Sequence, residues 1–282
     1  MLITLSIGIA LKSIKHGSDE LRGEHFILQS SIILDDILNI LKDSKELNKI
    51  TDVDSLSAFL DQTSILHLDT KDVKVTIEME SARSKINPNS LITKGREDAF
   101  KFYVTNHMIN EEYAYMIFDL IGGIKEDSGY NTDIFIENPH LFREHIVSKY
   151  QLDEVKKFYE KKFHENSLNN INTEELFYIT KDTNSSIYSL DVNYLTVASW
   201  ELILECTEDR AEMLHSAGGS YETISDLQLS LDEKLSLSKF ASSTFEPYID
   251  VKVKILQAHS SAYIRFEYNI KTKKGSNFVF EI

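Results

Sequence analysis

The chain has 282 residues, of which 42% are hydrophobic and 10% aromatic, so its composition is that of a folded globular protein and excludes a disordered one. Its net charge of −15 argues against nucleic acid as a partner over most of the surface, because phosphate binding needs Lys and Arg. The single cysteine, Cys206, excludes an internal disulfide and a Cys-based zinc cluster, and it favours a cytoplasmic location.

The first eleven residues alternate apolar with small or polar side chains, which predicts a strand. A helix start and a targeting segment are the alternatives. Lys12 and Lys15 follow the apolar run, whereas a signal peptide carries its positive charge before that run. The run is also too short to span a bilayer, so we expect no membrane partner.

The region 1–170 is predicted to be mainly helical, because its apolar residues recur at three- and four-residue spacings. Alternating or short apolar runs predict strands at 71–80 and 133–137. The predicted helices cover 18–43, 54–62 with Asp52 or Asp54 as cap, 96–121 with an interruption near 107–110, 138–150 and 152–165.

The polar, Asn-rich run 166–172 is the predicted boundary to a second, β-rich region, 171–282. Alternation over 187–206 predicts a strand, followed by a short helix that Thr207 caps and another helix at 232–241. Residues 248–282 hold three alternating runs separated by turn-like breaks, which predict an antiparallel three-strand meander. The predicted fold class is therefore α+β, with the helices mainly N-terminal and the strands mainly C-terminal.

The charge is unevenly distributed along the second region. Residues 171–247 hold 4 basic and 14 acidic side chains, a net charge of −10, whereas residues 248–282 hold 6 and 3, a net charge of +3. The basic closing meander is also rich in aromatic residues, which are favoured at the centres of protein interfaces. We therefore predict that it meets a protein partner or a second copy of the chain, through Tyr248, Tyr263, Arg265, Phe278 and Phe280.

Arg210 and His215 are the candidate catalytic pair. Their spacing resembles the Arg-x4-His motif of HEPN ribonucleases. That resemblance implies a cationic Arg210 and a general-base His215 at an RNA phosphate, on an all-helical fold. The alternative interpretation is a surface helix on which His215 lies near the C-terminal end, where the helix dipole favours a cation.

The sequence predicts no cofactor and no metal ion. His107 with Glu111, and His140 with Glu144 and His145, have spacings found among metal ligands, but neither set has the composition of a zinc site. The glycine pairs 122–123 and 218–219 lack the phosphate-loop spacings and are better explained as helix stops.

The sequence leaves two functions open. The first is a non-enzymatic interaction or assembly protein, such as a virion or phage structural component, an accessory subunit or an acidic inhibitor. The second is a divergent RNA- or DNA-cleaving protein of a toxin or anti-phage defence system that uses Arg210 and His215. Either function is expected in the cytoplasm, or in a virion if the chain comes from a phage.

Overall fold

The computed structural model describes residues 24–69, 73–93, 95–126, 129–180, 188–257 and 260–281. The predicted strand over the first eleven residues therefore lies outside the described part of the chain. The chain forms two compact units. Unit 1 combines the chain up to Ala82 with Pro247–Ile282, and unit 2 is the intervening segment Arg83–Glu246.

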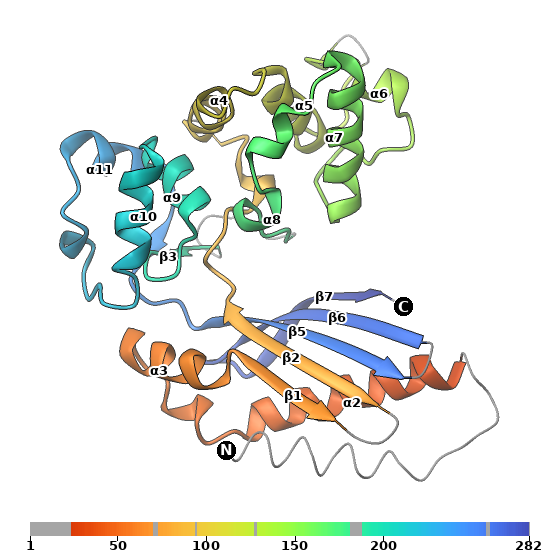
Figure 1. Ribbon diagram of the computed structural model, residues 1–282, viewed down its shortest axis with the longest axis vertical. Coiled ribbons are helices and arrows are strands. Elements are labelled where there is room, and N and C mark those ends of the chain that lie inside the picture. The colour runs from red at the N-terminus through yellow and green to blue at the C-terminus, as the bar shows by residue number, and fades with distance from the viewer. Residues whose placement is uncertain are drawn as a thin grey trace. The chain divides into compact units, whose positions relative to one another are not determined.

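Unit 1 contains a five-stranded antiparallel sheet in the order β1-β2-β5-β6-β7 (Figure 1). The central pairing joins β2 to β5, with Lys74 opposite Leu256 and Ser81 opposite Ile249. The two strands that form this pair flank unit 2 in the sequence. The strands are β1 (Ile65–Asp69), β2 (Lys74–Ser81), β5 (Tyr248–Gln257), β6 (Ser260–Asn269) and β7 (Lys274–Glu281).

Helices α2 (Glu24–Asp43) and α3 (Val53–Thr63) cover one face of this sheet (Figure 1). Apolar residues alternate along each central strand and are buried beneath the helices, as Val251, Val253 and Ile264 illustrate. Asp52 caps α3 by accepting a hydrogen bond from the backbone N–H of Ser55. No described helix, α2 included, combines the length and the apolar content that a membrane crossing requires.

Unit 2 is mainly helical and has its own core. Phe100 lies at the centre of that core, with its ring 5.8–6.3 Å from the rings of Phe177, Phe118 and Tyr113. Its α-helices are α4 (Arg96–Asn106), α5 (Glu112–Ile121), α6 (Ile134–Glu137), α7 (Lys149–Phe163), α8 (Thr173–Leu176), α9 (Val197–Leu204), α10 (Glu208–Ser216) and α11 (Leu231–Leu237). Unit 2 also contains a short parallel strand pair, β3 (Leu190–Asp191) with β4 (Ser242–Ser243). Its 3-10 turns are η3 (Pro88–Ser90), η5 (Ser167–Asn170) and η6 (Ile224–Leu227). A further 3-10 turn, η2 (Leu47–Lys49), belongs to unit 1.

The α+β class is confirmed, with the C-terminal antiparallel meander formed by β5, β6 and β7. The helices expected to end near Asp43 and to break near 107–110 are present as α2 and as the pair α4 and α5. Gly122 directly follows α5, as predicted. Thr207 occupies the N-cap position of α10, but its side chain makes no capping hydrogen bond. The Asn-rich run 166–172 lies within unit 2, where it contains η5 and Asn172, the capping residue of α8.

The predicted strand over 187–206 is wrong, because 197–204 is the helix α9. Every residue of α9 from Ala198 to Leu204 is buried, so the helix has no polar face that would reveal a period near 3.6 residues. The signal that sequence reasoning missed is Thr196, whose side chain accepts a hydrogen bond from the N–H of Ser199 and caps the helix.

Two further element predictions are wrong. Residues 134–137 form the single helical turn α6 in place of a strand, and residues 138–148 form a loop where a helix was predicted over 138–150. The helix predicted over 152–165 is present as α7 (Lys149–Phe163). The side-chain amide of Asn89 accepts a hydrogen bond from the N–H of Ile146 at 2.6 Å and donates to its carbonyl at 2.9 Å. These bonds satisfy the loop backbone locally and replace the bonds of a helix.

Candidate functional site

The outer edge of β7 exposes apolar side chains of unit 1. β7 lies at one end of the sheet and pairs with β6, and no strand within the described ranges pairs with its other side. Phe278 and Phe280 remain 50% and 39% exposed. Phe280 lies opposite the buried Ile264, and Phe278 stacks on the buried Phe266 at 5.5 Å, so both side chains lie on the core face of the sheet.

On the core face, the opposite edge of the same sheet is covered. There, Leu66 of β1 lies opposite Ile77 on the core face and is only 8% exposed. Within the described part of the chain, the core face is therefore covered at the β1 edge and exposed at the β7 edge. An exposed edge with apolar side chains presents both unpaired backbone groups and a surface that favours association.

A β-bulge interrupts β7 at its middle. Arg265 pairs with Val279 and Glu267 pairs with Ser276, so two residues of β7 stand opposite Phe266 alone. Asn277, one of these two, has a φ of 53°, a left-handed conformation that Asn tolerates better than most residues. The bulge shifts the alternation of β7 by one residue, which changes the faces on which its terminal residues lie.

α2 approaches β7 at Gly275. A Cβ atom at this glycine would lie 2.7 Å from the Phe278 ring and 3.0 Å from Cδ2 of Leu38, closer than packed side chains allow. Ile27 precedes Leu38 by eleven residues, about three turns, so it lies on the same side of α2. Ile27 is also exposed, and together with Phe278 and Phe280 it extends the apolar character of this end of unit 1.

Arg265, a predicted interface residue, is engaged inside unit 1. Its Nε lies 2.9 Å from both carboxylate oxygens of Asp250, whose side chain is fully buried. Lys252 lies 3.8 Å from the same carboxylate and 2.7 Å from Glu80. Burial raises the pKa of Asp250, and the nearby Arg265 opposes that shift. This pair belongs to a charged network on the face of the sheet opposite α2.

The two predicted interface tyrosines also belong to unit 1. Tyr248 begins β5 and is half-buried, and Tyr263 of β6 is half-buried opposite Glu281. Burial raises the pKa of Tyr263 to about 12, so its phenol stays neutral at physiological pH. Of the five predicted interface residues, Phe278 and Phe280 are the two most exposed side chains.

The predicted catalytic pair lies on α10 of unit 2. Arg210 forms an ion pair with Glu233 of α11, with 2.8 Å between Nε and Oε1, and its Nη2 donates to the Gln228 carbonyl at 3.4 Å. His215 Nδ1 lies 2.8 Å from the carbonyl oxygen of Leu195, so Nδ1 carries the proton in this bond. Both side chains therefore connect α10 to neighbouring segments of the unit.

No group of three or more His, Cys, Asp or Glu side chains in the described ranges is arranged to hold a metal ion. Two of the three histidines considered from the sequence lie near carboxylates outside their own motifs. His107 lies 3.4 Å from Glu201, and His140 lies 3.9 Å from Glu154.

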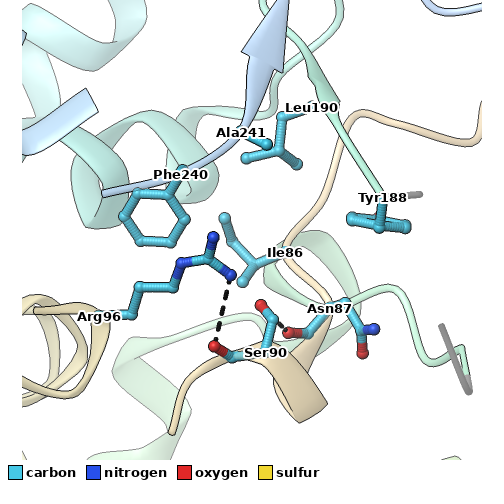
Figure 2. A pocket seen from close by; sticks show the side chains of 8 residues that line it. All are labelled: Ile86, Asn87, Ser90, Arg96, Tyr188, Leu190, Phe240 and Ala241. Atoms are coloured by element: carbon cyan, nitrogen blue, oxygen red, sulfur yellow. Dashed lines mark hydrogen bonds between the residues drawn. The ribbon is translucent and has the colours of Figure 1, made fainter. Parts of the chain in front are cut away.

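Figure 2 shows a small pocket in unit 2 around Arg96. The Arg96 guanidinium donates to the carbonyls of Lys239 and Ser90, at 2.7 and 3.4 Å, and lies over the ring of Phe240. The cavity volume is about 10 Å³, far below the roughly 300–1,000 Å³ of typical small-molecule sites. Arg96 is thus a buried connection between segments, and the pocket has no room for a substrate of ordinary size.

Comparison with known proteins adds one fold-level finding. No protein-family model and no curated protein matches the sequence. The structure is similar to a chain in the crystal structure of the GspK-GspI-GspJ complex from the type 2 secretion system of enterotoxigenic Escherichia coli. The TM-score is 0.54, the sequence identity is 10%, and the match covers 92% of this chain and 95% of that chain. At this identity the likeness shows a shared fold.

Sequence reasoning identified Phe278 and Phe280 but missed their surroundings. It did not identify Val279, 40% exposed on the opposite face of β7, or the contribution of α2. A signal for the bulge was present, because Gly275 and Asn277 are poor strand residues inside an alternating run. The open core edge depends on strand order, which alternation alone does not determine.

Proposed function

We propose that this chain is a non-enzymatic subunit of a protein assembly and that it contacts a neighbouring subunit through the outer edge of β7. The observation that carries the proposal is the exposure of Phe278 and Phe280 on the core face of the sheet. Covering these rings would remove apolar surface from water and would close the core at this edge.

The shared fold supports an assembly function. The similar chain belongs to a complex of three different proteins in a secretion system, and the match covers nearly the whole of both chains. The chemistry of unit 2 is consistent with the same proposal, because Arg210 is ion-paired with Glu233 and Arg96 is bonded to backbone carbonyls. The exposed β7 edge is therefore a stronger functional candidate than either arginine.

Edge strands bind partners in a characteristic way. An extended segment that adds to the edge gains main-chain hydrogen bonds, and its alternate side chains contact those of the edge strand. A segment paired with β7 would place every second side chain beside Phe278 and Phe280, on the face that α2 covers. The partner segment should therefore carry apolar side chains on that face.

The test is a double variant, Phe278→Ser with Phe280→Ser, produced in the native host in place of the wild-type chain. Its matched control is Ile124→Ser with Ile136→Ser, because those isoleucines of unit 2 are 73% and 70% exposed. The size of the native complex that contains the chain is measured for each variant by gradient sedimentation.

We expect the β7 variant to sediment as the free chain and the control to sediment with the complex. Thermal unfolding of both purified variants shows that each is folded. A wild-type chain that sediments alone, or a β7 variant that remains in the complex, would contradict the proposal.

A further inference from the structure

The bulge makes β7 symmetric about its own midpoint. Lys274 lies opposite Asn269 and Glu281 lies opposite Tyr263 on β6. Asn269 and Tyr263 are six residues apart on β6, so their side chains lie on the same face of the sheet. Lys274 and Glu281, which lie opposite them, therefore share that face as well. These two residues of β7 are seven positions apart and would lie on opposite faces of a regular strand.

The same symmetry holds for the residues between them. Gly275 and Phe280 lie opposite Tyr268 and Ile264, so both are on the core face. Ser276 and Val279 lie opposite Glu267 and Arg265, so both are on the other face. The order of faces is consequently the same whether β7 is followed from Lys274 inwards or from Glu281 inwards.

Antiparallel pairing of two identical strands requires such a symmetry. A regular strand has it about every residue, whereas β7 has it over its full length only about the bulge, so the bulge fixes the register. Residues directly opposite one another in an antiparallel ladder share a face, and they also share the direction of their backbone hydrogen bonds. In a two-fold arrangement centred on Asn277 and Phe278, the residue pairs on each side of the bulge meet both conditions. The pairs are Lys274 with Glu281, Gly275 with Phe280, and Ser276 with Val279 of the second copy.

The side chains in these pairs are also complementary. Lys274 would meet Glu281 of the second copy at both ends of the strand, giving two opposite-charge pairs. On the core face, the Phe278 ring of the same chain already lies beside Gly275, so Phe280 of the second copy would pack against that ring. Both features depend on residues at matching distances from the bulge.

We propose that β7 pairs with β7 of a second copy of this chain, antiparallel and two-fold symmetric about the bulge. This inference rests on the proposed assembly function and specifies one contact within it. The dimer contact is isologous, as in most homodimers, and joins two five-stranded sheets along their open edges. The bulge interrupts the ladder at its centre, so each half of the strand contributes three residue pairs.

Charge reversal tests the register directly. The variants are Lys274→Glu, Glu281→Lys and the double variant with both changes; the control is Lys45→Glu, an exposed lysine in the turn after α2. Sedimentation equilibrium of the purified full chain gives the dimer dissociation constant for each variant. Thermal unfolding confirms that each variant is folded.

Each single change places like charges together at both ends, so we expect it to weaken the dimer by about tenfold or more. The double variant exchanges the two charges and should recover the wild-type constant. An equimolar mixture of the two single variants should form a heterodimer, since every charge then faces its opposite. Lys45→Glu should change the constant less than twofold.

A wild-type chain that stays monomeric at high concentration would overturn the inference, and so would a dimer that the single variants do not weaken or that the double variant does not recover. The native-complex experiment separates this failure from failure of the proposed function. A chain that is monomeric when pure, but leaves the host complex when Phe278 and Phe280 are changed, assembles through β7 with a different protein. A chain that shows neither behaviour refutes both proposals.

Discussion

The ion pair between Arg265 and Asp250 gives a sharp prediction for unit 1. Replacing Arg265 with Gln leaves the fully buried Asp250 carboxylate with Lys252 at 3.8 Å as its remaining cation. Breaking one partner of a buried ion pair costs about 3–5 kcal/mol. Because Lys252 remains and Arg265 is itself partly exposed, we expect the lower end, about 3 kcal/mol, or roughly 10 °C in the melting temperature.

The pH dependence of this loss distinguishes the ion pair from simple packing. Burial raises the pKa of Asp250, and Arg265 opposes that shift, so removing Arg265 raises the pKa further in the folded chain. The folded variant then takes up a proton at a higher pH than the unfolded chain does. Its stability deficit should be largest near pH 7 and should narrow as the pH falls toward about 5.

The assay combines thermal unfolding with hydrogen exchange of β5 and β6 amides, which reports on unit 1 separately from unit 2. The control is Lys254→Gln, because the pair of Lys254 with Glu78 is more exposed to solvent and should be worth less than about 1 kcal/mol. A loss for Arg265→Gln no larger than that of the control, or one that stays the same at both pH values, would refute the reasoning.

Three further predictions concern unit 2. Burial raises the pKa of Asp191 to about 7, so the Asp191 carboxyl holds its proton more tightly in the folded chain than in the unfolded chain. The free energy of unfolding should therefore fall by at most about 4 kcal/mol as the pH rises from about 4 to about 7. Urea unfolding followed by Trp200 fluorescence measures that slope, and Asp191→Asn should flatten it; an unchanged slope would exclude Asp191 as its source. Phe100→Ala should cost about 3–5 kcal/mol in thermal unfolding, whereas Phe102→Ala, on the same helix but 43% exposed, should cost far less, and equal losses would contradict the assigned core. Arg210→Ala should lower the free energy of unfolding by about 1 kcal/mol, because the ion pair of Arg210 with Glu233 is partly exposed. The same variant should leave any RNA cleavage by the purified chain unchanged; loss of a wild-type cleavage activity would support the nuclease alternative.

The elements that sequence predicted best have one clear polar face. β2, β5 and β6 alternate because their apolar side chains face α2 and α3, and their charged ones, such as Lys252 and Glu80, form ion pairs on the other face. α2 likewise has one buried stripe, which includes Ile33 and Ile37. In α9 almost every residue is buried, so its apolar residues show no 3.6-residue spacing, and the strand predicted over 187–206 was wrong.

The candidate site was predictable only in part. Phe278 and Phe280 are visible in the sequence as apolar residues of a terminal strand. Their significance depends on β7 lying at the edge of the sheet, and that depends on β2 pairing with β5 across the whole of unit 2. Local periodicity carries no information about which distant strands pair. The symmetry of β7 depends on the register around Asn277, which also follows only from the structure.

Site-specific crosslinking from the β7 edge is the most direct test of the assembly function. A photoreactive amino acid replaces Phe280 in the chain produced in its native host, and a matched chain carries it at Ile124, which is more exposed and belongs to unit 2. Crosslinked products are separated by size and identified by mass spectrometry. Position 280 should give one dominant protein adduct, either a second copy of this chain or another subunit, and position 124 should not give it. No adduct from position 280, or the same adducts from both positions, would contradict the assignment of β7 as the assembly surface.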